Sequence, residues 1–400
     1  MTTRHKRIYM ALILISAGLL RLSLISSPGN QGDLEWFFQW SQGLEKYGLS
    51  NFYASMDFAD YPPGYLYILC ALGYLFRYTS CNHYILLKLP AILFDLITIA
   101  VFLHLLFRSD MHVCHHIAAL FFAFNPMSIY NSAVYGQVES VLTLCLVLTL
   151  YAMYTKRYEL AAALYALAFL IKPQAIIIGP AILFAAMVQL RQSWKYWLRR
   201  LFLCIGIFFL VFYLLSLPFS GGRLNPLWLL DLYKNTMLGY NQVSLNAYNF
   251  WWMLNIHWVD SSLMFGPLSY KTWGYLMVCT GLLLCGWLHV HQTEPARIFS
   301  TAAIFYSIFF MVCCCMHERY LYPAAILFFF SYLLCQKRLY LLAGIGLSIQ
   351  NFWNQYGSLH WEGILHGLRR SIALAGVLIV FTILILMLAG AKRTTSSSPH

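Results

Sequence analysis

The stretch Gly32-Asp33-Leu34-Glu35-Trp36 follows the first hydrophobic segment of the chain, where a segment leaving a bilayer would enter the interface. It places two carboxylates two residues apart and is followed by further aromatic residues. Ionised side chains at the edge of an apolar environment are costly unless they have a partner or a task. We interpret this stretch as an active-site loop around which the remaining hydrophobic segments are organised. The plain alternative is a pair of solvated loop acids.

The composition identifies the class of protein. The 400 residues are 60% hydrophobic and only 10% charged, with a mean hydropathy of +0.65, which excludes a soluble globular domain. The net charge of +12 comes from basic residues in small clusters at the ends of apolar segments. Membrane topology explains this distribution better than a nucleic-acid surface does. The eleven cysteines have no CxxC spacing, so we expect them to be thiols buried as small core residues.

Apolar length and cytoplasmic basic clusters predict an all-α polytopic membrane protein of about 12 transmembrane helices with both termini inside. A single membrane domain, 1–400, accounts for the whole chain. The expected helices cover about 8–26, 84–107, 113–130, 138–155, 201–217, 267–289, 298–315, 320–335, 339–351 and 371–390, with two more between 160 and 190.

Two long external segments interrupt this arrangement. The first, 27–83, contains the acidic stretch and an apolar run at 65–76 that is too short to span a bilayer comfortably, so we expect an interfacial or re-entrant helix there. The second, 218–265, is rich in Asn, Trp and Tyr. Lys172-Pro173-Gln174 divides the stretch 160–190 into two helices with an external turn, because proline removes a backbone donor and disfavours helix in the preceding residue.

Polar side chains gather on one side of the membrane in this topology, although they were not used to build it. The external side receives Asp33, Glu35, Asp60, Glu139, Lys172, His317, Glu318 and Arg319. Polar residues from several loops that meet on one face predict one site. A carboxylate at the membrane surface can act as general base for the attack of an acceptor hydroxyl on a sugar carbon. The residues alone do not rank Asp33 against Glu35 for this role.

The basic residues of this face are suited to an anion. Lys172 lies deep in an apolar stretch, where an unpaired ammonium costs about 2.5–3.5 kcal/mol, so an anionic partner is expected. In His317-Glu318-Arg319-Tyr320, the arginine can hold a phosphate bidentately and the histidine can donate to it. The alternative for this tetrad is a helix-end cap with an arginine that reaches the interface. The predicted donor-phosphate group comprises Lys172, His317, Glu318, Arg319 and Tyr322.

The remaining candidate residues would bind a sugar substrate. Asp60-Tyr61-Pro62-Pro63-Gly64 is typical of a rigid turn that starts a helix, and Asp60 is equally suited to a sugar hydroxyl. Gln137 and Glu139 either face the cavity or cap the following helix. Amides and aromatic rings of the second external segment suit sugars, although tryptophan and tyrosine also crowd any membrane interface. The predicted substrate group comprises Glu35, Asp60, Tyr61, Gln137, Glu139, Gln242 and Asn246.

The order of these motifs resembles that of the GT-C glycosyltransferases. Gly32-Asp33 with Glu35, Asp60-Tyr61-Pro62-Pro63, Asn125-Pro126 with Tyr135-Gly136-Gln137, Lys172-Pro173-Gln174 and His317-Glu318-Arg319-Tyr320 occur in the same order over about 30–325. The chain looks most similar to the bacterial GPI-mannosyltransferase-like group. The lack of a soluble domain after the last expected helix is unlike oligosaccharyltransferases and aminoarabinose transferases.

The resemblance implies a GT-C fold with external juxtamembrane helices in the first external loop. It implies inverting transfer of a hexose, with mannose favoured, from a polyprenyl-phosphate monosaccharide to a glycan, lipid or protein acceptor of the cell envelope, on the extracytoplasmic face. It ranks Asp33 as the base and places Lys172 and the 317–319 group near the donor phosphate. It also implies neither a metal nor another cofactor.

Two other functions compete with this hypothesis. A transporter or flippase for lipid-linked sugars would need a polar cavity too, but it predicts inverted repeats and polar residues near the middle of the membrane or on both faces. A transferase of another group, such as phosphoethanolamine, would normally bring external clusters of Asp and His as metal ligands, and the sequence has none.

Overall fold

The computed structural model describes residues 3–108, 112–190, 193–294, 296–360 and 366–396, which are mostly helical. The elements are α1 (Thr3–Leu24), α2 (Gln31–Ser55), α3 (Pro63–Phe76), α4 (His83–Leu106), α5 (Val113–Ala123), α6 (Pro126–Ile129), the π-helical turn η1 (Tyr130–Tyr135), α7 (Glu139–Tyr154), α8 (Tyr158–Ile171), η2 (Pro173–Ile178), α9 (Gly179–Leu190), α10 (Trp194–Ser216), η3 (Leu217–Phe219), α11 (Leu227–Leu238), β1 (Ser244–Leu245), α12 (Phe250–Met253), β2 (Met264–Phe265), β3 (Leu268–Ser269), α13 (Tyr270–His291), α14 (Arg297–Val312), β4 (Met316–His317), α15 (Tyr322–Cys335), α16 (Arg338–Leu359) and α17 (His366–Ser396). The predicted all-α class is confirmed.

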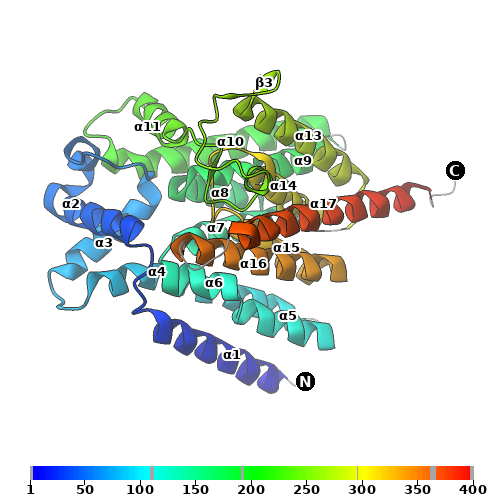
Figure 1. Cartoon of the computed structure of the whole chain (residues 1–400), viewed down its shortest axis with the longest axis horizontal. Helices are drawn as coiled ribbons and strands as arrows, with labels where there is room; N and C mark the ends of the chain where they lie inside the picture. Colours follow the sequence, from blue (N-terminus) through cyan, green and yellow to red (C-terminus); the bar gives the residue numbers. More distant parts are fainter. Residues whose placement is uncertain (1–2, 109–111, 191–192, 295, 361–365, 397–400) are drawn as a thin grey trace.

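The long helices run side by side, and the shorter helices α2, α3 and α11 lie at one end of the bundle (Figure 1). Both chain ends lie toward the opposite end (Figure 1). There Lys6 Nζ donates to the carbonyl of Phe107, 2.7 Å away, which joins the start of α1 to the end of α4. The bundle therefore has the shorter helices α2, α3 and α11 at one end and the start of α1 at the other.

Seven helical segments of the described chain are long and apolar enough to cross a membrane. They are Arg4–Leu24, His83–Leu106, Val113–Tyr135, Pro173–Leu190, Trp194–Phe219, Tyr270–His291 and Gly367–Ala391. The protein is therefore a membrane protein. Five further apolar helices, α3, α7, α8, α14 and α15, have 14 to 16 residues each.

The centre of the bundle is formed by α14 and α15, whose side chains are nearly all buried. Phenylalanines from several helices stack there: Phe102 lies 4.1 Å from Phe122 between ring centroids, and both approach Phe330. By contrast, few side chains of α1 and α10 are buried. Exposed leucines and phenylalanines along a spanning helix are the surface that a lipid bilayer covers.

The predicted active-site loop is wrong in its secondary structure, because Gly32 to Trp36 form the first turns of α2. Asn30 is its N-cap and accepts a hydrogen bond from the amide of Asp33 at 3.4 Å. An asparagine in this position replaces a missing backbone partner, and an aspartate in the first turn interacts favourably with the helix dipole. The short helix expected at 65–76 is present as α3.

Three predicted helix boundaries also differ. The helix expected over 113–130 extends to Tyr135 as one span, inside which Asn125 is fully buried, caps α6 and donates from Nδ2 to Ser348 Oγ at 2.8 Å. The helix expected over 298–315 ends at Val312, and the chain then pairs β4 with β1 in parallel. The helix expected over 339–351 continues to Leu359, because its buried amides find partners in neighbouring segments.

Candidate active site

The start of α2 is attached to the end of η1. The amide of Asn30 donates to the carbonyl of Tyr135 at 3.1 Å. Gly29, with φ of +72°, precedes it, and a Cβ at this position would lie 2.7 Å from the carbonyl oxygen of Val134. Only glycine allows the backbone this conformation and this close approach. The first turn of α2, which carries Asp33, is thereby held against η1.

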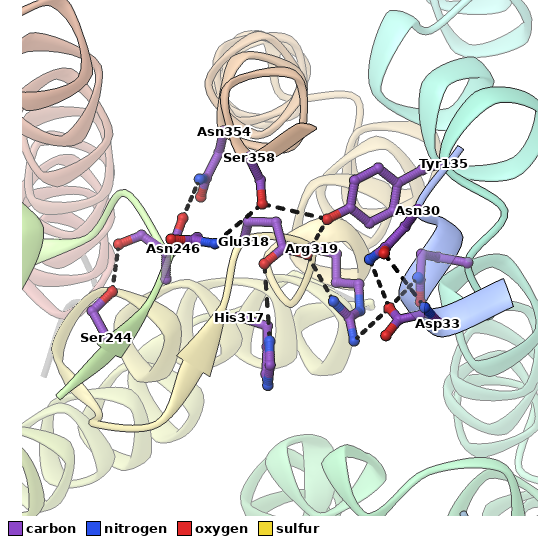
Figure 2. A network of polar contacts seen from close by, with 12 residues as sticks. Asn30, Asp33, Tyr135, Ser244, Asn246, His317, Glu318, Arg319, Asn354 and Ser358 are labelled. Carbon is purple, nitrogen blue, oxygen red and sulfur yellow. Dashed lines mark hydrogen bonds and ion pairs between the residues drawn. The ribbon is translucent and has the colours of Figure 1, made fainter. Parts of the chain in front are cut away.

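Three polar side chains approach the same oxygen of Asp33, and two of them, those of Asn30 and Arg319, are labelled in Figure 2. Oδ2 accepts from Asn30 Nδ2 at 2.9 Å and from Gln137 Nε2 at 2.5 Å, and Arg319 Nη2 lies 3.4 Å away. Within the described part of the chain, Oδ1 accepts no hydrogen bond, and the side chain is 32% exposed. Asp33 therefore has one carboxylate oxygen held by three partners, and its partly exposed side chain leaves the other oxygen open to a ligand.

The π-helical turn η1 fixes Gln137. The carbonyl of Asn131 accepts from the amides of both Gly136 and Gln137 at 3.0 Å. Gly136 has a left-handed conformation, and a Cβ there would lie 2.9 Å from Leu34. Single π-helical turns are frequent at functional sites, because the extra residue changes the direction of side chains. Here the turn directs the fully buried Gln137 toward Asp33.

Glu139 and Lys172 form a buried ion pair beside this carboxylate. Lys172 Nζ donates to Glu139 Oε1 at 2.6 Å, and the two side chains are 5% and 2% exposed. The ammonium also lies 5.4 Å from the ring centroid of Tyr61 and 5.8 Å from that of Tyr320. The predicted turn at Lys172 is confirmed: α8 ends at Ile171, and Lys172 is extended. Glu139 is the anionic partner that a buried lysine requires.

Arg319 joins the two acidic groups. Its guanidinium lies 2.7 Å from Glu318 Oε1, 3.4 Å from Asp33 Oδ2 and 3.6 Å from Glu139 Oε1. Glu318 Oε1 also accepts from the hydroxyl of Tyr135 at 2.7 Å. Burial opposes the charge, but the surrounding carboxylates of Asp33, Glu318 and Glu139 hold the pKa of Arg319 well above its ordinary value. Arg319 is thus a fixed cation between α2, α7 and its own loop.

His317 lies in β4 between two tyrosine rings. The centroids of Tyr240 and Tyr320 are each 5.0 Å from its own. Burial and the nearby charge of Arg319 lower the pKa of His317 well below its ordinary value, so the imidazole is neutral near pH 7. A neutral imidazole can donate one hydrogen bond to a ligand. The distance from His317 Nδ1 to Glu318 Oε2 is 3.9 Å.

The cluster, as far as the chain is described, has more acids than bases. Two cations, Lys172 and Arg319, face three carboxylates. Asp60 lies on the loop before α3. Burial raises the pKa of Asp60, the charge of Lys172 acts to lower it, and the charge of Asp33 acts to raise it. An anionic ligand that approaches this cluster must therefore replace a carboxylate beside one of the cations.

The structure brings together part of the predicted site. Asp33, Gln137, Glu139, Lys172, Glu318 and Arg319 form one contact network, which His317, Tyr61 and Asp60 adjoin. Glu35 points elsewhere, because its carboxylate accepts from Tyr84 and Gln39. Tyr322 is buried and accepts from Ser128. The side chain of Gln242 accepts from the amide of Asn241 in its own loop, and Asn246 lies on the other side of the 317–319 segment (Figure 2).

Several residues of the site were not predicted. For Asn30 the sequence did contain an indication, because an asparagine three residues before an aspartate is typical of a helix cap. The amides of α16 had one too, because Asn351, Asn354, Gln355 and Ser358 recur at helical spacing. Asn351 donates to the backbone carbonyl of Glu318 at 2.6 Å and so supports the loop that carries Arg319.

Neither a scan against protein-family models nor a search of the curated proteins found a match for this chain. Among the described residues, no three side chains of His, Cys, Asp or Glu are grouped so that they could hold a metal ion. The chemistry that the arrangement permits is proton transfer at the exposed oxygen of Asp33, next to two buried cations and a neutral imidazole.

Proposed function

We propose that the protein is an integral-membrane glycosyltransferase. It transfers a hexose, with mannose favoured, from a polyprenyl-phosphate monosaccharide to an acceptor on the extracytoplasmic face, with inversion at the anomeric carbon. In this proposal the shorter apolar helices α7, α8, α14 and α15, together with α16, join the seven long ones to give the GT-C arrangement of about twelve spans. The observation that carries the proposal is the position of Asp33, whose partly exposed carboxylate lies beside Arg319 and near Lys172.

Asp33 is the general base. Its Oδ1 takes the proton of the acceptor hydroxyl while the acceptor oxygen forms a bond to the anomeric carbon. The bond between that carbon and the phosphate oxygen breaks, and its electron pair leaves with the lipid phosphate. Asn30 and Gln137 keep the carboxylate in place through the other oxygen. A phosphate is a stable anion, so the leaving group requires little help from an acid.

Arg319, Lys172 and His317 stabilise the phosphate as its charge develops. Because Arg319 holds Asp33 only loosely, at 3.4 Å, a donor phosphate can replace that contact. The exchange has a second effect, since a carboxylate that loses a cationic neighbour becomes a better proton acceptor. Glu318 keeps its 2.7 Å contact with Arg319 and holds the guanidinium in position during the exchange.

The experiment is a transfer assay in detergent with radiolabelled polyprenyl-phosphate-mannose and polyprenyl-phosphate-glucose, and a nucleotide-sugar as control donor. Asp33→Asn should abolish turnover and leave donor binding intact. Glu35→Gln is the matched control, because Glu35 lies one half-turn away in α2 and is bonded to Tyr84 and Gln39. It should retain most of the activity.

Two results would contradict the proposal. Equal turnover by the wild-type protein and Asp33→Asn would exclude Asp33 as the base. Donor binding without turnover, across glycan, lipid and protein acceptors and unchanged in Asp33→Asn, would favour a carrier of lipid-linked sugars instead.

A further inference from the structure

A hollow lies beside the 317–319 segment, with a volume of about 440 Å³ and a wide opening. Its lining residues are Asn246, His257, Trp258 and Ser358. They come from the second long loop and from the end of α16. The proposed transfer mechanism uses none of them.

Trp258 is exposed yet fixed in orientation. The side chain is 56% exposed, and its indole Nε1 donates to Asn246 Oδ1 at 2.9 Å. Its backbone amide donates to the carbonyl of Ser244 at 3.0 Å. Other tryptophans of this loop are used differently: Trp251 and Trp252 are fully buried. An exposed indole with a fixed ring offers a preorganised flat surface to a ligand.

Asn246 is the residue that holds this ring. Its Nδ2 donates to Ser358 Oγ at 3.3 Å, and its carbonyl accepts from Asn354 at 2.6 Å, so its side chain and its carbonyl both have partners (Figure 2). Asn246 and Trp258 both have left-handed backbones, with φ of +61° and +55°. Left-handed non-glycine residues are unfavourable and concentrate at ligand sites, where the surrounding structure imposes them.

The lining excludes most classes of ligand. Among the described residues it contains an indole, an amide, a hydroxyl and an imidazole, but no carboxylate, ammonium or guanidinium group. A phosphate or an ionic peptide would find no opposite charge there. A lipid tail would find too few apolar side chains. A neutral ligand with apolar ring faces and many hydroxyls fits these groups, and that combination defines a saccharide.

One side chain, that of Tyr135, contacts residues of both the hollow and the candidate active site. The hydroxyl of Tyr135 lies within hydrogen-bond distance of both Ser358 Oγ, at 3.5 Å, and Glu318 Oε1, at 2.7 Å. Asn246 pairs with His317 on one side of the 317–319 segment, while Arg319 contacts Asp33 on the other (Figure 2). A sugar on Trp258 is therefore separated from the base by this segment and is not the unit that reacts.

We propose that this hollow, here called the Trp258 pocket, binds a saccharide unit of the acceptor at a distance from the reacting hydroxyl. The acceptor is then a glycan of more than one unit rather than a protein side chain or a simple lipid. The role as an acceptor subsite rests on the proposed glycosyl transfer, whereas saccharide binding by the pocket does not.

The test is saccharide binding by the full-length protein, measured by saturation-transfer difference NMR without any donor. The probes are methyl α-mannoside, methyl α-glucoside and an α-linked mannotriose. Trp258→Ala should weaken binding by about tenfold, the usual loss when a central aromatic contact is truncated. Trp258→Phe should bind better than Trp258→Ala because it keeps a flat ring. Trp194→Ala, which removes a tryptophan that is 62% exposed at the start of α10, should bind like the wild-type protein.

Unchanged binding in Trp258→Ala would overturn the proposal, and so would the failure of all three probes to bind the wild-type protein. Thermal unfolding of each variant keeps a folding defect apart from a binding defect. With turnover established, Trp258→Ala should raise the KM of mannotriose and leave its kcat and the KM of the donor unchanged. Trp258-dependent binding in a protein that transfers no sugar would preserve the pocket and contradict the proposed function.

Discussion

Two groups of buried charges differ in their exposure to water and in the number of carboxylates relative to cations. In the first, Arg21 of α1 pairs with Asp95 of α4 at 2.8 Å, and the side chains are 0% and 3% exposed. Arg21 also donates to the carbonyls of Ala17 and Ala123, and Asp95 accepts from the hydroxyl of Ser132. In the second, Asp33 is 32% exposed, and carboxylates outnumber cations.

Under the proposed function, this difference separates a structural role from a chemical one. A closed pair with matched charges holds α1, α4 and η1 together and has no access for a ligand. An open cluster with an excess of carboxylates leaves one acid available for proton transfer. The turn η1 contributes to both, because Ser132 contacts Asp95 while Tyr135 contacts Glu318.

The largest expected effect tests the open cluster. Asp33→Asn should lower kcat of sugar transfer by about 10²–10⁴-fold, the range for loss of a general base. The amide keeps the size of the carboxylate, so the melting temperature should remain close to that of the wild-type protein. Single-turnover assays beside calorimetry measure both quantities. A loss of activity that follows a loss of stability would assign Asp33 a structural role.

Substitutions in the pair of Arg21 and Asp95 should instead change the free energy of unfolding. Arg21→Met leaves Asp95 buried without its cation, and such a change costs about 3–5 kcal/mol of unfolding free energy. The double variant Arg21→Met/Asp95→Leu should recover most of this loss, since a hydrophobic pair is often as stable as a buried ion pair. Chemical denaturation in detergent measures the four members of the cycle. The specific activity of the folded double variant should stay close to that of the wild-type protein.

The same set of single and double variants at Lys172 and Glu139 tests the difference between the two groups of charges most directly. Lys172→Met should destabilise the protein by a similar few kcal/mol, and Lys172→Met/Glu139→Leu should restore its stability. Activity should remain low in the double variant, because the cation near the donor phosphate is still missing. Recovery of both stability and activity would place this pair in the same class as Arg21 and Asp95.

Arg319→Lys should have a smaller effect. The ammonium keeps the charge but cannot make the forked contacts with Glu318, Asp33 and Glu139. Losing one charged hydrogen bond costs about 1.5–3 kcal/mol, which corresponds to roughly 10–150-fold in kcat/KM for the donor. Arg319→Met should be worse than Arg319→Lys. Equal activities of the two variants would show that the charge of residue 319 is not used.

The smallest effect concerns pH and His317. Its folded pKa lies below the ordinary value of 6.5, so the unfolded chain takes up the proton first as the pH falls. The contribution of His317 to stability is therefore full above pH 6.5 and decreases below it, by at most about 1.4 kcal/mol per pH unit. His317→Gln should unfold with a flatter pH dependence between pH 7.5 and 5.5. Identical slopes would mean that the pKa of His317 does not differ between the folded and the unfolded protein.

Much of the bundle could be predicted, because apolar length and basic clusters act locally in the sequence. The turn at Lys172 and the meeting of Asp33, Glu139 and Arg319 followed from such signals. The pair of Arg21 and Asp95 did not, since each residue lies singly in an apolar helix and nothing local indicates its partner. Whether these elements catalyse sugar transfer is a prediction that the experiments above address.

Other features depend on contacts between distant segments. The strands β1 and β4 have two residues each and pair across some seventy positions, so neither has a local signal. The helix α2 was missed because polar and charged residues interrupt its apolar positions, and its cap, Asn30, is one polar residue among several. Glu35 was predicted beside Asp33, but its place on the helix turns it toward Tyr84 instead.

The distribution of the site along the chain has a consequence for biosynthesis. Asp33 lies near the start of the chain and Arg319 near its end, and their contact closes the cluster. At about 5–20 residues per second, tens of seconds separate the synthesis of the two residues. During that interval, the first turn of α2 carries Asp33 without its contact to the guanidinium of Arg319. A ribosome-bound chain that ends before Arg319 should have no activity, and this stage should be the most vulnerable to proteases.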